Sequence, residues 1–406
     1  MMSRITKTRP PSCQGMHDQK QVNNKNTTQK MIYTREQTMK IQMSLLAIAI
    51  AFTSQAMADN NTADVDQTGF MNMANVDQTS RNGGSLDSNH NSDIDQTGAF
   101  NKAKTYQNGV NHVIRINQVG GGNRAKTTQY SSTNTGIVDQ KGVRNTVDMN
   151  QKSYKHTARI TQQGLANKSS SWQGASGSPA GRENLLVVSQ EGVFNKSSAT
   201  QQGSHAIARV TQTGYKHDSD VLQVGEYNRA RVTQDGRFHN STVTQTGTMG
   251  IAVVDQAGSR SDSTVTQAGD LQVARVTQEG SSHDSLINQS GMQNTALVTQ
   301  SDMLQYSDIS QSGENNLAIN VQSGYKNAAI VVQTGSNSDS LITQSGAYDH
   351  AHVIQSGSGH RSEILQQGGG FLSFATNSAH VTQSGAMNIS SVTQTGGGNV
   401  ANVMQY

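Results

Sequence analysis

The chain has 406 residues, of which 33% are hydrophobic, 4% are aromatic, 39 are glycine and three are proline. So few apolar side chains could not fill the core of a globular domain of this size, whereas a solenoid buries only a few side chains in each coil. Once residues 1–58 are set aside, 23 Lys and Arg stand against 26 Asp and Glu, and this net charge of −3 excludes a basic nucleic-acid-binding protein.

Residues 39–58 read MKIQMSLLAIAIAFTSQAMA and have the three parts of a secretory signal peptide. Lys40 supplies the positive start, residues 43–52 supply the apolar segment, and an A-x-A-type site ends at Ala58, after which we expect cleavage. Residues 1–38 carry no repeat, and we interpret them as a mis-called upstream extension or, alternatively, as an unusually long, disordered leader. Neither segment is expected in the mature protein.

From residue 61 onward a short sequence motif, called the phrase below, recurs every eleven residues. It consists of a small residue, Val or Ile, Gln and Gly, each two positions after the one before. Side chains spaced by two share one face of a β-strand, as Ala208, Val210 and Gln212 would. Gly two residues after each Gln is expected to end a seven-residue strand and to open a four-residue turn, because Gly accepts positive φ at low cost. The phrase predicts 30 glutamine-ended strands.

The small residue alternates between Ser and Ala from Ser197 to Ala318, so the full repeat is 22 residues: strand, turn, strand, turn. This pattern predicts an all-β fold, a two-sheet β-solenoid of the cross-β kind with about 15 coils. At roughly 4.8 Å for each coil, the solenoid would be about 70 Å long. We expect residues 59–406 to form this single domain.

Three long loops interrupt the period, over residues 79–89, 174–183 and 367–376. They follow the second, tenth and twenty-seventh strands. Because turns alternate between the two edges of a two-strand coil, the first two loops should leave from one edge and the third from the other.

A glutamine on the inner face must be paired, because a buried amide without a partner costs about 1–3 kcal/mol. Glutamines stacked in successive coils can form a ladder of amide hydrogen bonds. The Asn that often stands five residues after Gln is expected to form a second amide column. The predicted core ladder includes Gln212, Gln223, Gln234, Gln245, Gln256, Gln267, Gln278, Gln289, Gln300, Val210, Val232, Val254, Val276, Asn228, Asn294 and Asn316.

Histidines such as His217 and His239 recur where Asn is expected, 22 residues apart. They could bind a metal, but replacement of Asn in the same column is the simpler interpretation. No nucleophile–His–acid group stands out, and the glycines lead into strands rather than into helices, as a phosphate-binding loop would require. The sequence therefore predicts no enzyme activity, no metal site and no cofactor.

The phrase resembles the curlin repeat, with Gln223, Gly225, Asn228, Ala230 and Gln234 at the positions of its Gln, Gly, Asn, Ala and Gln. The Ser lies four residues before Gln here, two positions later than in curlin. The resemblance extends over residues 61–406. It differs in length, since familiar curlins have about five repeats, and in the Gly-rich targeting segment, where only Asp59 and Asn60 stand here.

The resemblance implies a subunit of curli amyloid fibres, of the major-subunit or nucleator type. Such a subunit is secreted unfolded and assembles on the outer surface of Gram-negative cells for adhesion and biofilm matrix. The implied partners are further copies of the chain, a curli nucleator and secretion machinery, with contacts to cell and abiotic surfaces and none to nucleic acid. Open solenoid ends also favour self-assembly, because each exposes unpaired backbone groups. The alternative is a monomeric β-solenoid adhesin that binds through its long loops.

Overall fold

A computed structural model describes residues 60–79, 88–174, 181–368 and 376–406. These residues form 30 β-strands and no helix, which confirms the all-β solenoid. Among them, no helix of the length and hydrophobicity needed to cross a membrane occurs. The expected leader, with its cleavage site at Ala58, lies outside the described residues.

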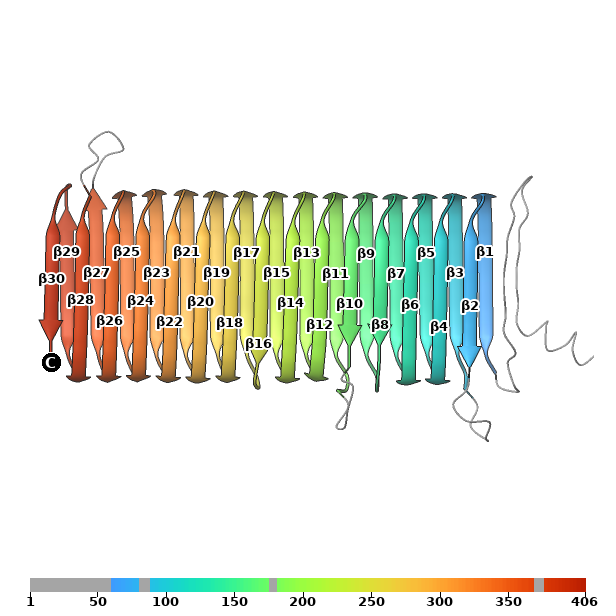
Figure 1. Cartoon of the computed structure of the whole chain (residues 1–406), viewed down its shortest axis with the longest axis horizontal. Coiled ribbons are helices and arrows are strands. Elements are labelled where there is room, and N and C mark those ends of the chain that lie inside the picture. Colours follow the sequence, from blue (N-terminus) through green and yellow to red (C-terminus); the bar gives the residue numbers. More distant parts are fainter. Residues whose placement is uncertain (1–59, 80–87, 175–180, 369–375) are drawn as a thin grey trace, which may run out of the picture.

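The strands form two 15-stranded parallel sheets that face each other along the whole length of the molecule, with their arrows in opposite directions (Figure 1). We call the sheet of odd-numbered strands sheet A and the sheet of even-numbered strands sheet B. Sheet A contains β1 (Thr62–Phe70), β3 (Asn91–Ala99), β5 (Val113–Gly121), β7 (Thr135–Val143), β9 (Thr157–Leu165), β11 (Leu185–Val193), β13 (Ile207–Tyr215), β15 (Arg229–Arg237), β17 (Ile251–Ser259), β19 (Val273–Ser281), β21 (Thr295–Met303), β23 (Leu317–Tyr325), β25 (Asp339–Ala347), β27 (Arg361–Gly368) and β29 (Ile389–Thr395). Sheet B contains β2 (Met73–Thr79), β4 (Lys102–Val110), β6 (Arg124–Ser132), β8 (Thr146–Gln151), β10 (Lys168–Gln173), β12 (Lys196–Ser204), β14 (Asp218–Glu226), β16 (Asn240–Thr246), β18 (Asp262–Asp270), β20 (Asp284–Met292), β22 (Tyr306–Glu314), β24 (Ala328–Ser336), β26 (His350–Ser358), β28 (Ser378–Ala386) and β30 (Val400–Gln405).

The register places like residues on like residues from coil to coil. In the β13–β15 pair, for example, Ala208 lies opposite Ala230, and Gln212 lies opposite Gln234. A glutamine lies opposite a glutamine in all 28 strand pairings. A shift of one residue would turn the whole inner set of a strand outward, so the apolar pattern fixes this register.

The core is a narrow layer between the two sheets. The small residue, the Val or Ile and the Gln of each phrase point into it, while the intervening side chains face solvent, as in the alternating burial of β13. Burial of one Val or Ile side chain contributes roughly 1.5–3 kcal/mol, and this gain recurs in every coil. A thin apolar set therefore suffices for a long molecule.

Most strands are longer than the seven residues that the sequence indicated, because they continue through the glycine. β13 has nine residues and includes Gly214, and only Lys216 and His217 separate it from β14. Gly214 has φ of +125° and Lys216 has φ of +55°, so two left-handed residues make the reversal. A Cβ at Gly214 would also overlap the backbone carbonyl of Gly236 in the next coil. Glycine is thus needed for close stacking as well as for its φ.

The interruptions begin at strand ends on opposite edges of the solenoid, as the alternation of turns predicts. β2 and β10 belong to sheet B, whereas β27 belongs to sheet A, and the two sheets run in opposite directions (Figure 1). The central parts of the three loops, residues 80–87, 175–180 and 369–375, lie outside the described residues.

Candidate assembly site: amide columns and solenoid ends

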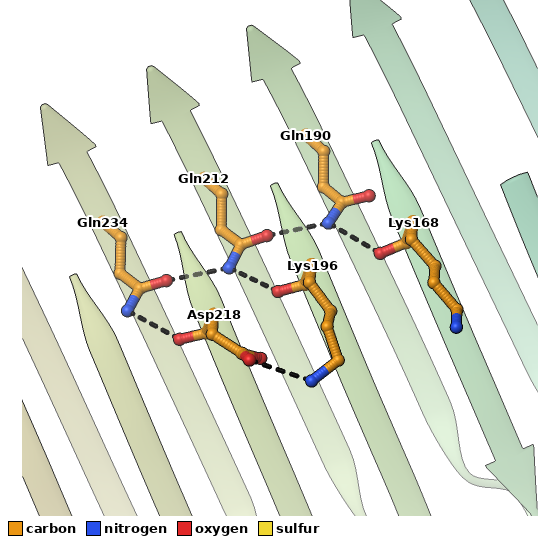
Figure 2. Close-up of polar contacts among 6 residues, drawn as sticks. All are labelled: Lys168, Gln190, Lys196, Gln212, Asp218 and Gln234. Carbon is orange, nitrogen blue, oxygen red and sulfur yellow. Dashed lines mark hydrogen bonds and ion pairs between the residues drawn. The ribbon is translucent and has the colours of Figure 1, made fainter. Parts of the chain in front are cut away.

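A continuous column of glutamine side chains runs through each sheet. Gln190 Nε2 donates a hydrogen bond to Gln212 Oε1 at 2.8 Å, and Gln212 Nε2 donates to Gln234 Oε1 at 2.8 Å (Figure 2). From Gln78 onward, the second hydrogen of each amide bonds to a backbone carbonyl of the opposite sheet. Gln212 donates in this way to Lys196 O at 2.8 Å, and Gln234 donates to Asp218 O at 3.0 Å (Figure 2).

Each glutamine between the two end coils therefore joins three strands: its own, the next strand of its sheet and one of the facing sheet. This arrangement satisfies the buried amide on both hydrogens, so the inner glutamines carry no desolvation penalty from unmet donors. All nine glutamines of the expected core ladder are at most 2% exposed, from Gln212 to Gln300. Val210, Val232, Val254 and Val276 lie beside them in sheet A and are fully buried.

The asparagines lie at the turns and bond mainly to the backbone rather than to one another. Asn294 Nδ2 donates to Ser290 O at 2.8 Å and to Gly313 O, in the next coil, at 3.1 Å. Its Oδ1 accepts the backbone N–H of Asn316 at 3.0 Å. Asn228 bonds to Val224 O and Gly247 O in the same way. One asparagine thus closes its own turn and clamps the following coil onto it.

Histidine makes the same contacts with an imidazole. His217 Nε2 contacts Thr213 O at 3.0 Å, and His217 Nδ1 accepts the backbone N–H of His239 at 3.3 Å. The two rings stack with centroids 5.1 Å apart. Burial lowers the pKa of both histidines and so favours the neutral ring. A proton on Nε2, which faces a backbone carbonyl, leaves Nδ1 able to accept. The described residues contain no group of three or more His, Cys, Asp or Glu placed to hold a metal ion.

The glutamine columns have one direction throughout. Every side-chain amide donates toward the next coil along the chain, from Gln67 to Gln96 at one end and from Gln383 to Gln405 at the other. Gln394 and Gln405 bond to the backbone carbonyls of Ser378 and Ile389, at 2.9 Å each, and no described glutamine follows to accept their second hydrogen. The acceptor oxygens of the first coil have no described glutamine donating to them.

The strands at the ends keep a free edge. β1, β2, β29 and β30 each pair with one strand only among the described residues. At the C-terminal end, Ala401 and Val403 pack against the core while remaining partly exposed. Ile389 is 69% exposed and Val400 is 81% exposed. The last coil therefore presents the same inner side chains as the middle coils, together with unpaired backbone groups and apolar surface.

A comparison with protein families identifies the repeat. The family model described as curlin associated repeat matches residues 181–214, 218–247, 274–301 and 321–346. The chain is a curlin-repeat protein. Its matched ranges fall between β11 and β25, and the strands outside them continue the same glutamine register. No curated protein matches the chain.

In this curlin-repeat protein the family phrase has a direct structural meaning. Its Gln forms the columns, its Gly allows close stacking of the reversals, and its Asn clamps successive turns. Curlin repeats occur in structural subunits rather than in enzymes. Sequence reasoning placed these residues in the core but missed the carbonyl partners and the single direction of the glutamine columns, for which no residue pattern gives a signal.

Proposed function

We propose that this curlin-repeat protein is a secreted fibre subunit whose copies stack end to end into curli-like amyloid on the surface of Gram-negative cells, for adhesion and biofilm matrix. The observation that carries the proposal is the pair of unidirectional glutamine columns, with donors left at Gln394 and Gln405 and acceptors at Gln67 and Gln78. These ends are complementary, so the last coil of one copy can continue as the first coil of the next.

The expected junction repeats the contacts inside the molecule. β29 and β30 of one copy would pair with β1 and β2 of the next, as each coil pairs with its successor in sheets A and B. Such a junction would add two glutamine hydrogen bonds and two backbone ladders. It would also partly cover the outward apolar side chains Ile389 and Val400; Ile251, at the position of Ile389 in a middle coil, is 39% exposed. Because edge strands with unmet N–H and C=O groups template further strands, growth needs no other component.

The remaining parts of the proposal rest on the family alone. They are export through a signal peptide ending at Ala58, passage through curli secretion machinery, and initiation by a curli nucleator. Whether the chain is a major subunit or itself a nucleator does not alter the junction described above.

The test places a lysine at one of two neighbouring positions in β30 of the purified chain, 402 or 403, whose side chains point to opposite faces of the strand. Val403 faces the core and Asn402 faces solvent. A lysine at 403 is tolerated at a free end, but it would be buried unpaired in a junction, at a cost of several kcal/mol. Val403→Lys should therefore add to a fibre end and stop its growth, whereas Asn402→Lys should leave growth unchanged.

Fibre growth is followed by amyloid-dye fluorescence from preformed seeds, with each variant added below stoichiometric amounts. Electron microscopy and fibre diffraction should show filaments with a meridional spacing near 4.7 Å. A wild-type chain that stays monomeric at high concentration would overturn the proposal and favour the monomeric adhesin.

A further inference from the structure

The outer face of sheet B is divided into two halves of opposite charge. The outward positions of the coils from β4 to β12 carry seven Lys or Arg and a single carboxylate, Asp148. The outward positions from β14 to β22 carry five Asp and, over these described strands, no Lys or Arg. We call these the basic half and the acidic half.

The division follows the register of the sheet. The first residues of successive strands stack in one row, and the charge of this row changes sign between β12 and β14. The change occurs at the ion pair of Lys196 Nζ and Asp218 Oδ2, 2.8 Å apart (Figure 2). The row runs Lys102, Arg124, Thr146, Lys168, Lys196 and then Asp218, Asn240, Asp262, Asp284.

The outer face of sheet A shows that separation of positive from negative side chains is not a general property of this solenoid. Its outer face mixes the charges and pairs them between coils, as in Arg115–Asp93 at 3.1 Å and Arg231–Asp255 at 2.8 Å. In the acidic half of sheet B, by contrast, Asp218 pairs with Lys196 at the boundary, and Asp262, Asp284 and Asp308 lie near one another. Burial raises the pKa of Asp284, and the neighbouring Asp262 raises it further. Charges of one sign repel one another at the spacing of the coils, so each half would be stabilised by opposite charge from another molecule.

We propose that two copies of this chain pack through their sheet B faces in antiparallel orientation, with the basic half of each on the acidic half of the other. A two-fold axis parallel to the strands, between β12 and β14, generates this pair. It places β4 opposite β22 of the second copy, β6 opposite β20, and β12 opposite β14. Because the axis keeps each position along the strand, Lys104 faces Asp308 of the second copy and Arg124 faces Asp284 of the second copy.

The same operation also matches side-chain sizes. The bulky outward side chains of the basic half are Tyr106, Tyr130 and Trp172, with Lys152 Nζ lying 4.5 Å from the Trp172 ring centroid. Counting strands and positions from the axis, these three face Ser310, Ser290 and Thr244 of the second copy, all of them small. Each of these three aromatic side chains therefore meets a small side chain across the paired face.

The face is large enough for a stable contact. Ten strands at about 4.8 Å and seven residues at about 3.3 Å give roughly 1,100 Å² for each copy, more than the roughly 800 Å² of a standard interface. A parallel pairing would place like charges together. A bound polyanion would neutralise the basic half only, and the acidic half would stay uncompensated. The second copy alone satisfies both halves.

This pairing is lateral and goes beyond end-to-end stacking, because it uses the outer face and leaves both solenoid ends free. It is tested on the purified chain by zero-length carbodiimide cross-linking of Lys to Asp, with peptides identified by mass spectrometry. β4 and β22 are nine coils apart, about 43 Å at roughly 4.8 Å per coil. A link between Lys104 and Asp308 must therefore join two copies.

We expect this link at low salt and its loss near 1 M salt, where the Debye length is about 3 Å. Lys104→Glu with Arg124→Glu should reduce cross-linked pairs at least tenfold, and Asp284→Lys with Asp308→Lys should do the same. The four changes together should restore pairing, because the two halves are then complementary again. The matched control on sheet A, Arg209→Glu with Arg275→Glu, makes the same charge change and should have no effect.

The proposal is overturned if the wild-type chain gives no link between positions 104 and 308, or if the charge-reversed variants link as well as the wild type. Binding of heparin to the basic half without cross-linked pairs would overturn it and assign that half to a polyanion. Fibre growth is read separately by dye fluorescence. Single filaments without cross-links would contradict lateral pairing alone, whereas cross-linked pairs that never elongate would contradict only the end-to-end function.

Discussion

Replacement of Gln234 by alanine tests the glutamine columns at a site where every contact is defined. The change removes three hydrogen bonds: from Gln212 Nε2 at 2.8 Å, to Gln256 Oε1 at 2.9 Å and to Asp218 O at 3.0 Å. Each leaves one buried polar group without its partner, which costs about 1–3 kcal/mol. Gln212 keeps its other bond, to Lys196 O. We therefore take the lower end for each group and expect a total loss of about 3 kcal/mol.

The assay is hydrogen exchange by mass spectrometry on peptides from β13 to β17, because a long repeat array opens locally as well as globally. A loss of about 3 kcal/mol corresponds to roughly 100-fold faster exchange in these strands, while distant coils such as β3 should change little. Thr233→Ala, on the outer face of the same strand, is the control and should stay within about 0.5 kcal/mol of the wild type. Equal exchange in the two variants would refute the account of the columns.

Three further predictions concern other parts of the coil. Gly236→Ala should lower the free energy of unfolding by more than about 2 kcal/mol, because the new Cβ would overlap the Gly258 carbonyl in addition to the strain of a positive φ. Gly398→Ala is the control for the φ strain alone, since its Cβ would meet nothing within 4 Å. Both variants are measured by urea unfolding. Burial and the neighbouring His90 lower the pKa of His112 from 6.5 to about 4. The stabilising contribution of neutral His112 is therefore complete above pH 6.5 and is lost as the pH falls toward 4. His112→Asn should reduce the fall in melting temperature between pH 7.5 and pH 4.5. Asn320 lies buried where other strands have Val or Ile, and its Oδ1 has no hydrogen-bond partner. Asn320→Val should therefore raise the free energy of unfolding by about 1 kcal/mol. A decrease would show that the hydrogen bond from Asn320 Nδ2 to Ser307 Oγ stabilises the chain by more than the unpaired Oδ1 costs.

The eleven-residue spacing of glutamine was enough to predict the number of strands, their inner faces and the two-strand coil. It could do so because the period of two within each phrase places Val210 and Gln212 on the same face of a strand. With one fixed turn length, only a two-strand coil buries both. Strand length was wrong by two residues. Gly214 was taken as the end of a strand, whereas its positive φ lets the backbone continue to pair with the next coil before Lys216 completes the reversal.

Other features of the molecule depend on relations that no single phrase contains. The bond from Gln212 to the Lys196 carbonyl depends on how the two sheets face each other. The donor direction of the columns is a choice between two orientations of the same amide, and the sequence is identical for both. The charge division of sheet B could have been found, because Lys168, Lys196 and Asp218 occupy one row of the register, but only once outward positions are compared between alternate strands.

The uniform orientation of the buried glutamines makes the two ends of the solenoid electrically unlike. Aligned side-chain amides add their dipoles head to tail along the stacking axis, as peptide units do along a helix. The end at β30 should carry partial positive charge and the end at β1 partial negative charge. A filament built from such units would itself be polar, with a partly positive tip where β30 is exposed and a partly negative tip where β1 is exposed.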